Sequence, residues 1–189
     1  MTEAAIEWWD TAGQRSMARY ALVEGAEQLK RALDQIAMLP TTPALRRQEI
    51  KLEVAYANAL ALMGNLVDGK EHYDRALAIY DPAEHRPLAT LSGRNVGVSI
   101  LSFRSACLWL LGYPLASRND AERALKNARE IDQPTTLMYA MWFALMAMPY
   151  AETTPRQMRR PTSSSLWRTK ESHRTGKQAE PRCGVGSLH

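Results

Sequence analysis

Small and apolar residues recur along this chain at helical spacing, and three segments end in one shared phrase. In this phrase a small residue is followed, after any three residues, by a bulky or small residue and then, after any two residues, by Ala-Leu. The phrase begins at Gly25, Gly69 and Ser117. Residues three or four positions apart share one face of a helix. Each phrase therefore predicts the second helix of a packed helix pair, with its small and apolar residues in the core.

Glycine or proline follows the predicted helices and divides the chain into pairs. Gly64 suits the left-handed conformation that follows a helix end, and Pro82 stops a helix because proline has no amide proton. We therefore expect an all-α solenoid of antiparallel helix pairs over residues 1–148. The predicted pairs span residues 3–39, 44–81 and 97–132, and an apolar segment at 135–148 predicts the first half of a fourth pair.

The composition changes after Met148. Residues 149–189 are rich in Arg, Ser, Thr and Pro and show little periodicity, which predicts a disordered basic tail. The abrupt change within a helix pair also suggests an out-of-frame ending. Residues 1–150 hold 16 Lys or Arg against 17 Asp or Glu, whereas residues 151–189 hold 8 against 3. The helical part therefore lacks the basic surface of a nucleic-acid-binding protein, and we expect no nucleic-acid partner.

Several features predict a reduced, cytoplasmic protein. Cys107 and Cys183 are far apart and have no C-x-x-C spacing. The acidic N-terminal residues are unlike a signal peptide. The longest apolar run, from Leu137 to Met148, has about twelve residues, against the roughly 20 that cross a bilayer as a helix. We therefore expect no membrane partner.

No catalytic, cofactor or metal site is expected from the motifs. Residues 64–70 spell G-x4-G-K, the start of a nucleotide-binding P-loop, but Glu71 stands where Ser or Thr would bind magnesium, and no strand is predicted before it. His72 and His85 have no His or Cys at metal-ligand spacing. These observations favour a non-catalytic protein.

The second predicted pair resembles a tetratricopeptide repeat (TPR). Ala57 and Gly69 stand at the positions where the two helices of such a repeat approach closely, and Leu60 and Tyr73 stand at the filler positions. The phrases are 44 and 48 residues apart instead of the usual 34, which predicts longer helices or loops.

In TPR arrays the first helix of each pair lines a concave surface, so the resemblance implies a partner-binding groove there. It would receive a protein partner or a small ligand. Each candidate also has a structural interpretation: solvated polar residues for Gln14, Lys51 and Ser102, a capped amide for Asn58, and core for Trp109. The candidate residues are Gln14, Lys51, Asn58, Ser102 and Trp109.

Longer phrases suggest a more specific family. Residues 78–86 read Ala-Ile-Tyr-Asp-Pro-Ala-Glu-His-Arg, and residues 108–114 read Leu-Trp-Leu-Leu-Gly-Tyr-Pro. They resemble the C-terminal repeat region of bacterial signalling proteins that join a class III adenylate/guanylate cyclase domain to an AAA-type ATPase domain. The resemblance implies a regulatory or interaction role in signal transduction. It transfers no catalytic residue, because the cyclase and ATPase domains of that family lie outside the repeats.

Two alternatives stay open at this point. The chain could be a truncated remnant of such a protein with no retained activity, and a nucleotide-handling enzyme is a third hypothesis. The half pair at 135–148 also predicts self-association, because solenoids need polar end caps. Its exposed residues would come from Leu137, Met141, Phe143 and Leu145.

Overall fold

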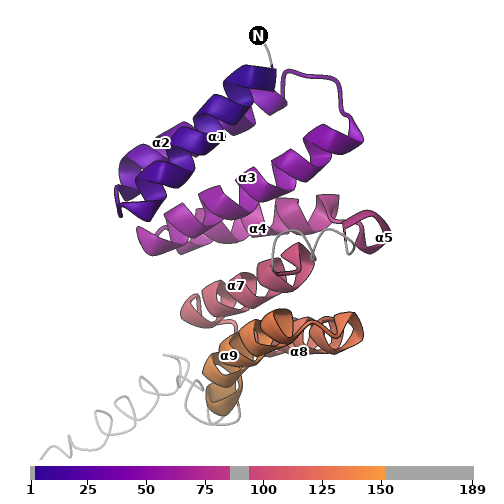
Figure 1. Cartoon of the computed structure of the whole chain (residues 1–189). Coiled ribbons are helices and arrows are strands. Elements are labelled where there is room, and N and C mark those ends of the chain that lie inside the picture. The colour runs from indigo at the N-terminus through magenta and orange to yellow at the C-terminus, as the bar shows by residue number, and fades with distance from the viewer. Residues whose placement is uncertain (1–2, 86–93, 152–189) are drawn as a thin grey trace, which may run out of the picture. The chain divides into compact units, whose positions relative to one another are not determined.

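The computed structural model describes residues 3–85 and 94–151, which are helices joined by short connections and contain no strand (Figure 1). The predicted all-α class is therefore confirmed for this part of the chain. The helices are α1 Glu3–Ala18, α2 Leu22–Ile36, α3 Pro43–Leu62, α4 Leu66–Ile79, α5 Pro82–His85, α7 Val96–Leu110, α8 Pro114–Ile131 and α9 Pro134–Ala151.

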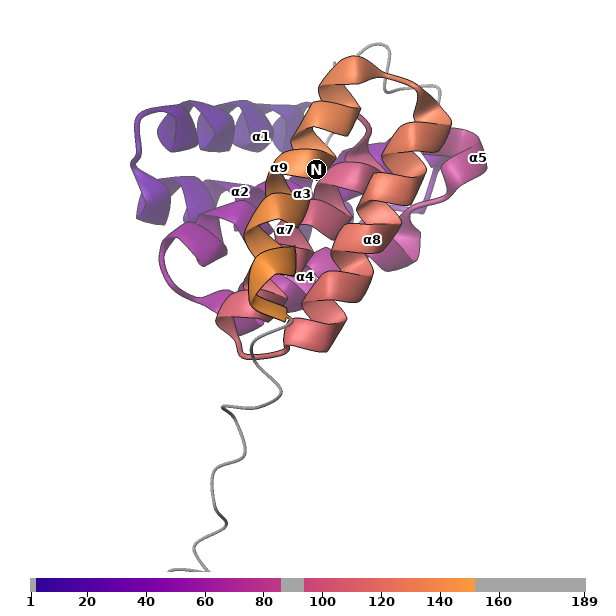
Figure 2. The same cartoon turned by 90° about the horizontal axis from the view of Figure 1, so that it is seen from below.

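The helices pack in the predicted pairs. α1 contacts α2, α3 contacts α4, and α7 contacts α8, and each second helix also contacts the first helix that follows it. α9 packs against both α8 and α7, as seen from the α8–α9 end in Figure 2. It reaches Ala151, three residues beyond its predicted end at Met148, so residues 149–151 belong to a helix. The remainder of the predicted tail, 152–189, lies outside the described residues.

A close contact between small residues twelve positions apart joins the two helices of each pair. A Cβ atom on Gly69 would lie 3.2 Å from the Ala57 carbonyl oxygen, so only a small residue lets these helices meet. In the third pair, Ser105 Oγ donates to the Ser117 carbonyl at 2.9 Å, and Ser117 Oγ donates to the Ser105 carbonyl at 2.8 Å. The three contacts join Gly13 to Gly25, Ala57 to Gly69 and Ser105 to Ser117.

A residue with positive φ lies in the turn after each first helix, seven residues after the close-contact residue. Gly64 and Gly112 have φ values of 87° and 85°. The equivalent residue after α1 is Tyr20, with φ of 59°, which a residue with a side chain adopts at a cost. All three helix-helix turns therefore contain a residue with positive φ, but only two of them have glycine there, the residue type that predicts this conformation from the sequence.

The core consists of three layers, each between a helix pair and the next first helix. Leu29 lies at the centre of the first layer, Tyr73 of the second and Ala124 of the third. Long side chains fill the first two layers, whereas alanines dominate α8 and let α9 approach closely. No helix among residues 3–85 and 94–151 is long and apolar enough to cross a membrane.

Polar contacts tie the second pair to the third. Arg104 on α7 lies 2.5 Å from Asp74 on α4 through its Nε, and it also pairs with the buried Asp120 on α8. Asn95 caps α7 by accepting from the Val98 amide at 3.1 Å. The two contacts of Arg104 cross between helices that also share apolar layers, so they orient packed elements.

Candidate functional site

An apolar groove opens on the side of the molecule formed by the first helices of the three pairs. Its volume is about 520 Å³, and none of its lining residues is charged. α1, α3 and α7 supply its walls, and α4 supplies two residues. The lining residues are Gln14, Met17, Ala55, Asn58, Ala61, Leu62, Leu66, Tyr73, Phe103, Ala106, Cys107 and Leu110.

The position of the groove follows from the close contacts between helices. The residue directly after each close-contact residue of a first helix lines the groove: Gln14 after Gly13, Asn58 after Ala57 and Ala106 after Ser105. A step of one residue turns about 100° around a helix, so these side chains leave their helices to the side of the close contact, where Asn58 can still reach Tyr73 of α4. The repeat therefore presents equivalent positions of successive pairs to one groove.

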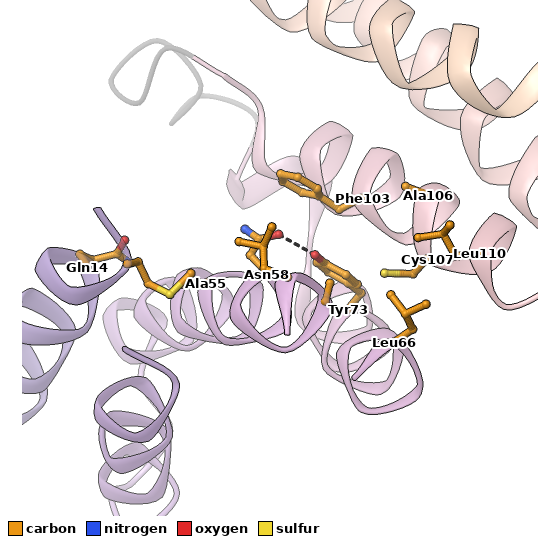
Figure 3. A pocket seen from close by; sticks show the side chains of 12 residues that line it. Gln14, Ala55, Asn58, Leu66, Tyr73, Phe103, Ala106, Cys107 and Leu110 are labelled. Carbon is orange, nitrogen blue, oxygen red and sulfur yellow. Dashed lines mark hydrogen bonds between the residues drawn. The ribbon is translucent and has the colours of Figure 1, made fainter. Parts of the chain in front are cut away.

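Asn58 and Tyr73 form the polar centre of the groove. The Tyr73 hydroxyl donates to Asn58 Oδ1 at 2.5 Å (Figure 3). Burial raises the pKa of Tyr73 far above its usual value, so the hydroxyl keeps its proton and remains a donor. Figure 3 shows the Asn58 amide nitrogen on the side away from Tyr73. Asn58 can therefore accept from Tyr73 with its oxygen and donate to a ligand with its nitrogen.

The remainder of the groove is apolar and aromatic. Tyr73 stacks on Phe103 with ring centroids 6.0 Å apart, and Phe103 meets Phe143 of α9 edge to face at 5.2 Å. Cys107 is buried, and burial raises the pKa of its thiol, so it contributes an apolar surface instead of a thiolate nucleophile. This lining can hold apolar side chains and orient them through few polar contacts.

Lys51 lies in a second, polar depression between α1 and α3. Glu7 and Asp10 of α1 line it together with Arg47 and Lys51 of α3, and its volume is about 490 Å³. Charges of both signs meet there, so this depression carries no single-sign field that would attract an ion. Lys51 is exposed, as expected for a solvated residue.

The structure brings together two of the five predicted partner-binding residues. Gln14 and Asn58 line the apolar groove, whereas Lys51 lies in the polar depression. Trp109 is half-buried and lines neither. Ser102 is fully buried, which corrects its placement on the binding surface, because it lies three residues before the close-contact residue Ser105 and faces the packed interior.

Three groove residues that the sequence did not single out are Met17, Phe103 and Leu110. Apolar residues on a helix of a repeat are normally assigned to the core, so their type hides them. Their register relative to Gln14 and Ala106 would have found them, because residues three or four positions apart lie on the same side of a helix.

The G-x4-G-K phrase does not form a phosphate-binding loop. Gly64 lies in the turn after α3 with positive φ, and Gly69 lies inside α4 against α3. Lys70 Nζ pairs with Asp74 at 2.7 Å. Each residue therefore has a part in the helical hairpin, and a helix stands where a P-loop needs a strand.

Metal-binding geometry is likewise not found within residues 3–85 and 94–151, where no three His, Cys, Asp or Glu residues are grouped to hold an ion. His72 Nδ1 lies 2.5 Å from Glu53 Oε2, and His85 Nδ1 lies 2.7 Å from the carbonyl oxygen of Asp81. Both histidines therefore make local contacts within their own region of the fold.

No model of a protein family matches this chain, and no curated protein matches it. The family resemblance noted from its sequence phrases therefore remains a prediction.

Proposed function

We propose that residues 3–151 are a non-catalytic recognition module of the TPR type, which binds a segment of a protein partner in the apolar groove. The observation that supports this proposal is the convergence of equivalent positions from three helix pairs on one groove, with Asn58 at its centre. Helical repeats use the surfaces of successive repeats for binding. The groove volume of about 520 Å³ falls within the range of ligand sites.

The chemistry of the lining selects a neutral, apolar ligand segment. A charged side chain would lose its hydration in a groove that has no charged lining residue, and nothing there would compensate. Met17, Phe103 and Leu110 offer contact to aliphatic or aromatic side chains. Gln14 and Asn58 offer hydrogen bonds to the peptide backbone. The expected ligand is therefore a short peptide segment with one or two large apolar side chains.

The same module would act as a regulatory or interaction region in a signalling protein. That part of the proposal rests on the resemblance of residues 78–86 and 108–114 to the repeat region of cyclase and ATPase signalling proteins. Recognition by the groove and regulation of an attached or separate enzyme are compatible, since a ligand that binds one of two states shifts the population toward that state.

A peptide selection tests the recognition proposal. The full 189-residue chain is immobilised, peptides are selected from a random phage-displayed library, and affinities are measured by fluorescence anisotropy. Ala106→Arg places a long charged side chain in the groove, and Ala78→Arg makes the same change at an exposed position of α4 that does not line it. We expect Ala106→Arg to weaken binding at least about tenfold and Ala78→Arg to leave it unchanged.

Asn58→Ala provides a second readout. This variant should weaken the binding of the selected apolar peptides without removing the groove, because it deletes the amide donor of Asn58 and leaves the apolar walls. The proposal fails if no apolar peptide is selected, or if selected peptides bind the Ala106→Arg and Ala78→Arg variants equally well.

A further inference from the structure

α9 carries an uncovered apolar stripe that is separate from the groove. The helix contains no charged residue, and five of its large apolar side chains are between 56% and 70% exposed. Their spacing of three and four residues places them on one face. Several hundred Å² of contiguous apolar surface is the size at which an exposed patch marks an interaction site. The stripe consists of Met138, Met141, Trp142, Leu145 and Met146.

The third helix pair shows what covers the equivalent face of a first helix. In α7, Ile100 packs toward α4, and the next residue, Leu101, packs toward α8 and is 1% exposed. Phe103 contacts Tyr73 of α4, and two residues later Ser105 makes the close contact with α8. The face that receives the second helix therefore lies one or two residues after the face that packs on the preceding pair.

In α9, the same offset of one or two residues between the two packing faces predicts the residues of the stripe. Ala140 and Ala144 pack against α8, so the covered face should contain the residues one and two positions later, which are Met141, Trp142, Leu145 and Met146. These are the exposed residues. Repeat symmetry thus identifies the stripe as a surface for an antiparallel helix. In Figure 2, α9 lies nearest the viewer, at the end of the array.

The side chains of the stripe indicate which helix packs there. The covered faces of α1, α3 and α7 have Gly13, Ala57 and Ser105 at the close contact, whereas the stripe contains only Met, Trp and Leu. A helix on α9 must therefore pack at a wider separation, with large side chains interdigitating. α9 itself provides such a surface, and a second uncharged α9 buries no unpaired charge.

A two-fold axis satisfies the antiparallel requirement directly. A symmetric dimer brings the same patch of both copies together, and an axis perpendicular to α9 makes the two helices antiparallel, as α8 is to α7. Trp142 lies four residues after Met138 and four before Met146. An axis at Trp142 therefore sets Met138 of each copy against Met146 of the other.

We propose that the α9 stripe is the interface of a two-fold symmetric dimer, in which α9 of a second copy occupies the place that a second helix has in the preceding pairs. Two stripes face to face reach about 1,200 Å² of buried surface, the lower end of the range for specific interfaces. The dimer should therefore dissociate on dilution. Of the four residues that the sequence offered for self-association, Met141 and Leu145 belong to this interface. Leu137 and Phe143 are half-buried instead, Leu137 against the third core layer and Phe143 against Phe103 of α7.

Sedimentation equilibrium of the full 189-residue chain over a range of concentrations tests the proposal. We expect a monomer–dimer equilibrium that Trp142→Glu weakens at least about tenfold. Leu115→Glu, at a 76% exposed apolar residue of α8, is the matched control and should keep the wild-type dissociation constant. Circular dichroism verifies that both variants retain the helical signal.

A charge pair tests the antiparallel arrangement. Met138→Lys and Met146→Glu should each weaken the dimer, and the double variant should regain affinity, because the two-fold axis places each introduced lysine against the glutamate of the other copy. A wild-type chain that stays monomeric at high concentration would overturn the proposal. So would a dimer that Trp142→Glu leaves intact, or single variants whose losses simply add in the double variant.

Discussion

The hydrogen bond between Tyr73 and Asn58 predicts a substitution whose effect changes sign with its background. Tyr73 is 1% exposed, and its hydroxyl donates to Asn58 Oδ1. Tyr73→Phe alone removes this bond, and the half-buried Asn58 can turn to water, so we expect a loss of about 1 kcal/mol in the free energy of unfolding. Asn58→Ala alone leaves a buried hydroxyl without its acceptor and should cost about 1–3 kcal/mol.

In the Asn58→Ala background, Tyr73→Phe removes the unsatisfied hydroxyl. The ring still packs against Phe103, so the double variant should be more stable than Asn58→Ala by about 1 kcal/mol. Urea unfolding followed by circular dichroism at 222 nm gives the four free energies of the cycle. Tyr113→Phe, at an exposed tyrosine, controls for the loss of a hydroxyl and should change little. An equal cost of Tyr73→Phe in both backgrounds would mean that the hydroxyl of Tyr73 does not depend on Asn58 as its acceptor.

Three further substitutions test the fold. Tyr20→Gly should raise the free energy of unfolding by about 0.5–1 kcal/mol in urea titrations, because glycine adopts the positive φ of this turn without strain. Leu29→Ala, in the first core layer, should lower the same free energy by about 3 kcal/mol, and a loss under 1 kcal/mol would mean that this layer is loosely packed. Burial raises the pKa of Asp120 although Arg104 lowers it, so the native state binds this proton more tightly than the unfolded chain, and stability falls as pH rises through the titration. Thermal melts should show that Asp120→Asn becomes more stable relative to the wild type as the pH rises above about 4, and a difference that stays constant with pH would contradict this sign.

The helix pairs could be predicted because the close contact leaves a mark in the sequence. Position 69 must hold a small residue because Ala57 of the neighbouring helix contacts it, and such a position can be recognised from one sequence. The positive φ of Tyr20 could not be predicted, because this residue adopts the conformation that favours glycine without being glycine. The end of α9 was placed too early, because a proline in the last turn of a helix removes one hydrogen bond without ending the helix there.

The groove could be predicted only in part. Gln14 and Asn58 are polar residues of first helices, and the resemblance to TPR arrays places the binding surface on those helices, so both could be predicted. Ser102 is polar as well, but its register turns it into the core, where its hydroxyl has no hydrogen-bond partner among the described residues. Phe103 and Leu110 look like core residues by type and were therefore not predicted, although their register with Ala106 places them on the groove side of α7.

Methyl NMR shows directly whether the groove receives an apolar peptide. The full chain is labelled at the methyl groups of Ala, Leu and Met and titrated with the tightest peptide from the selection. We expect the largest shift changes at Met17, Ala106 and Leu110, with Leu115 of α8 unchanged. Changes confined to Met138 and Met141 of α9, or no change in the groove at saturating peptide, would contradict the claim.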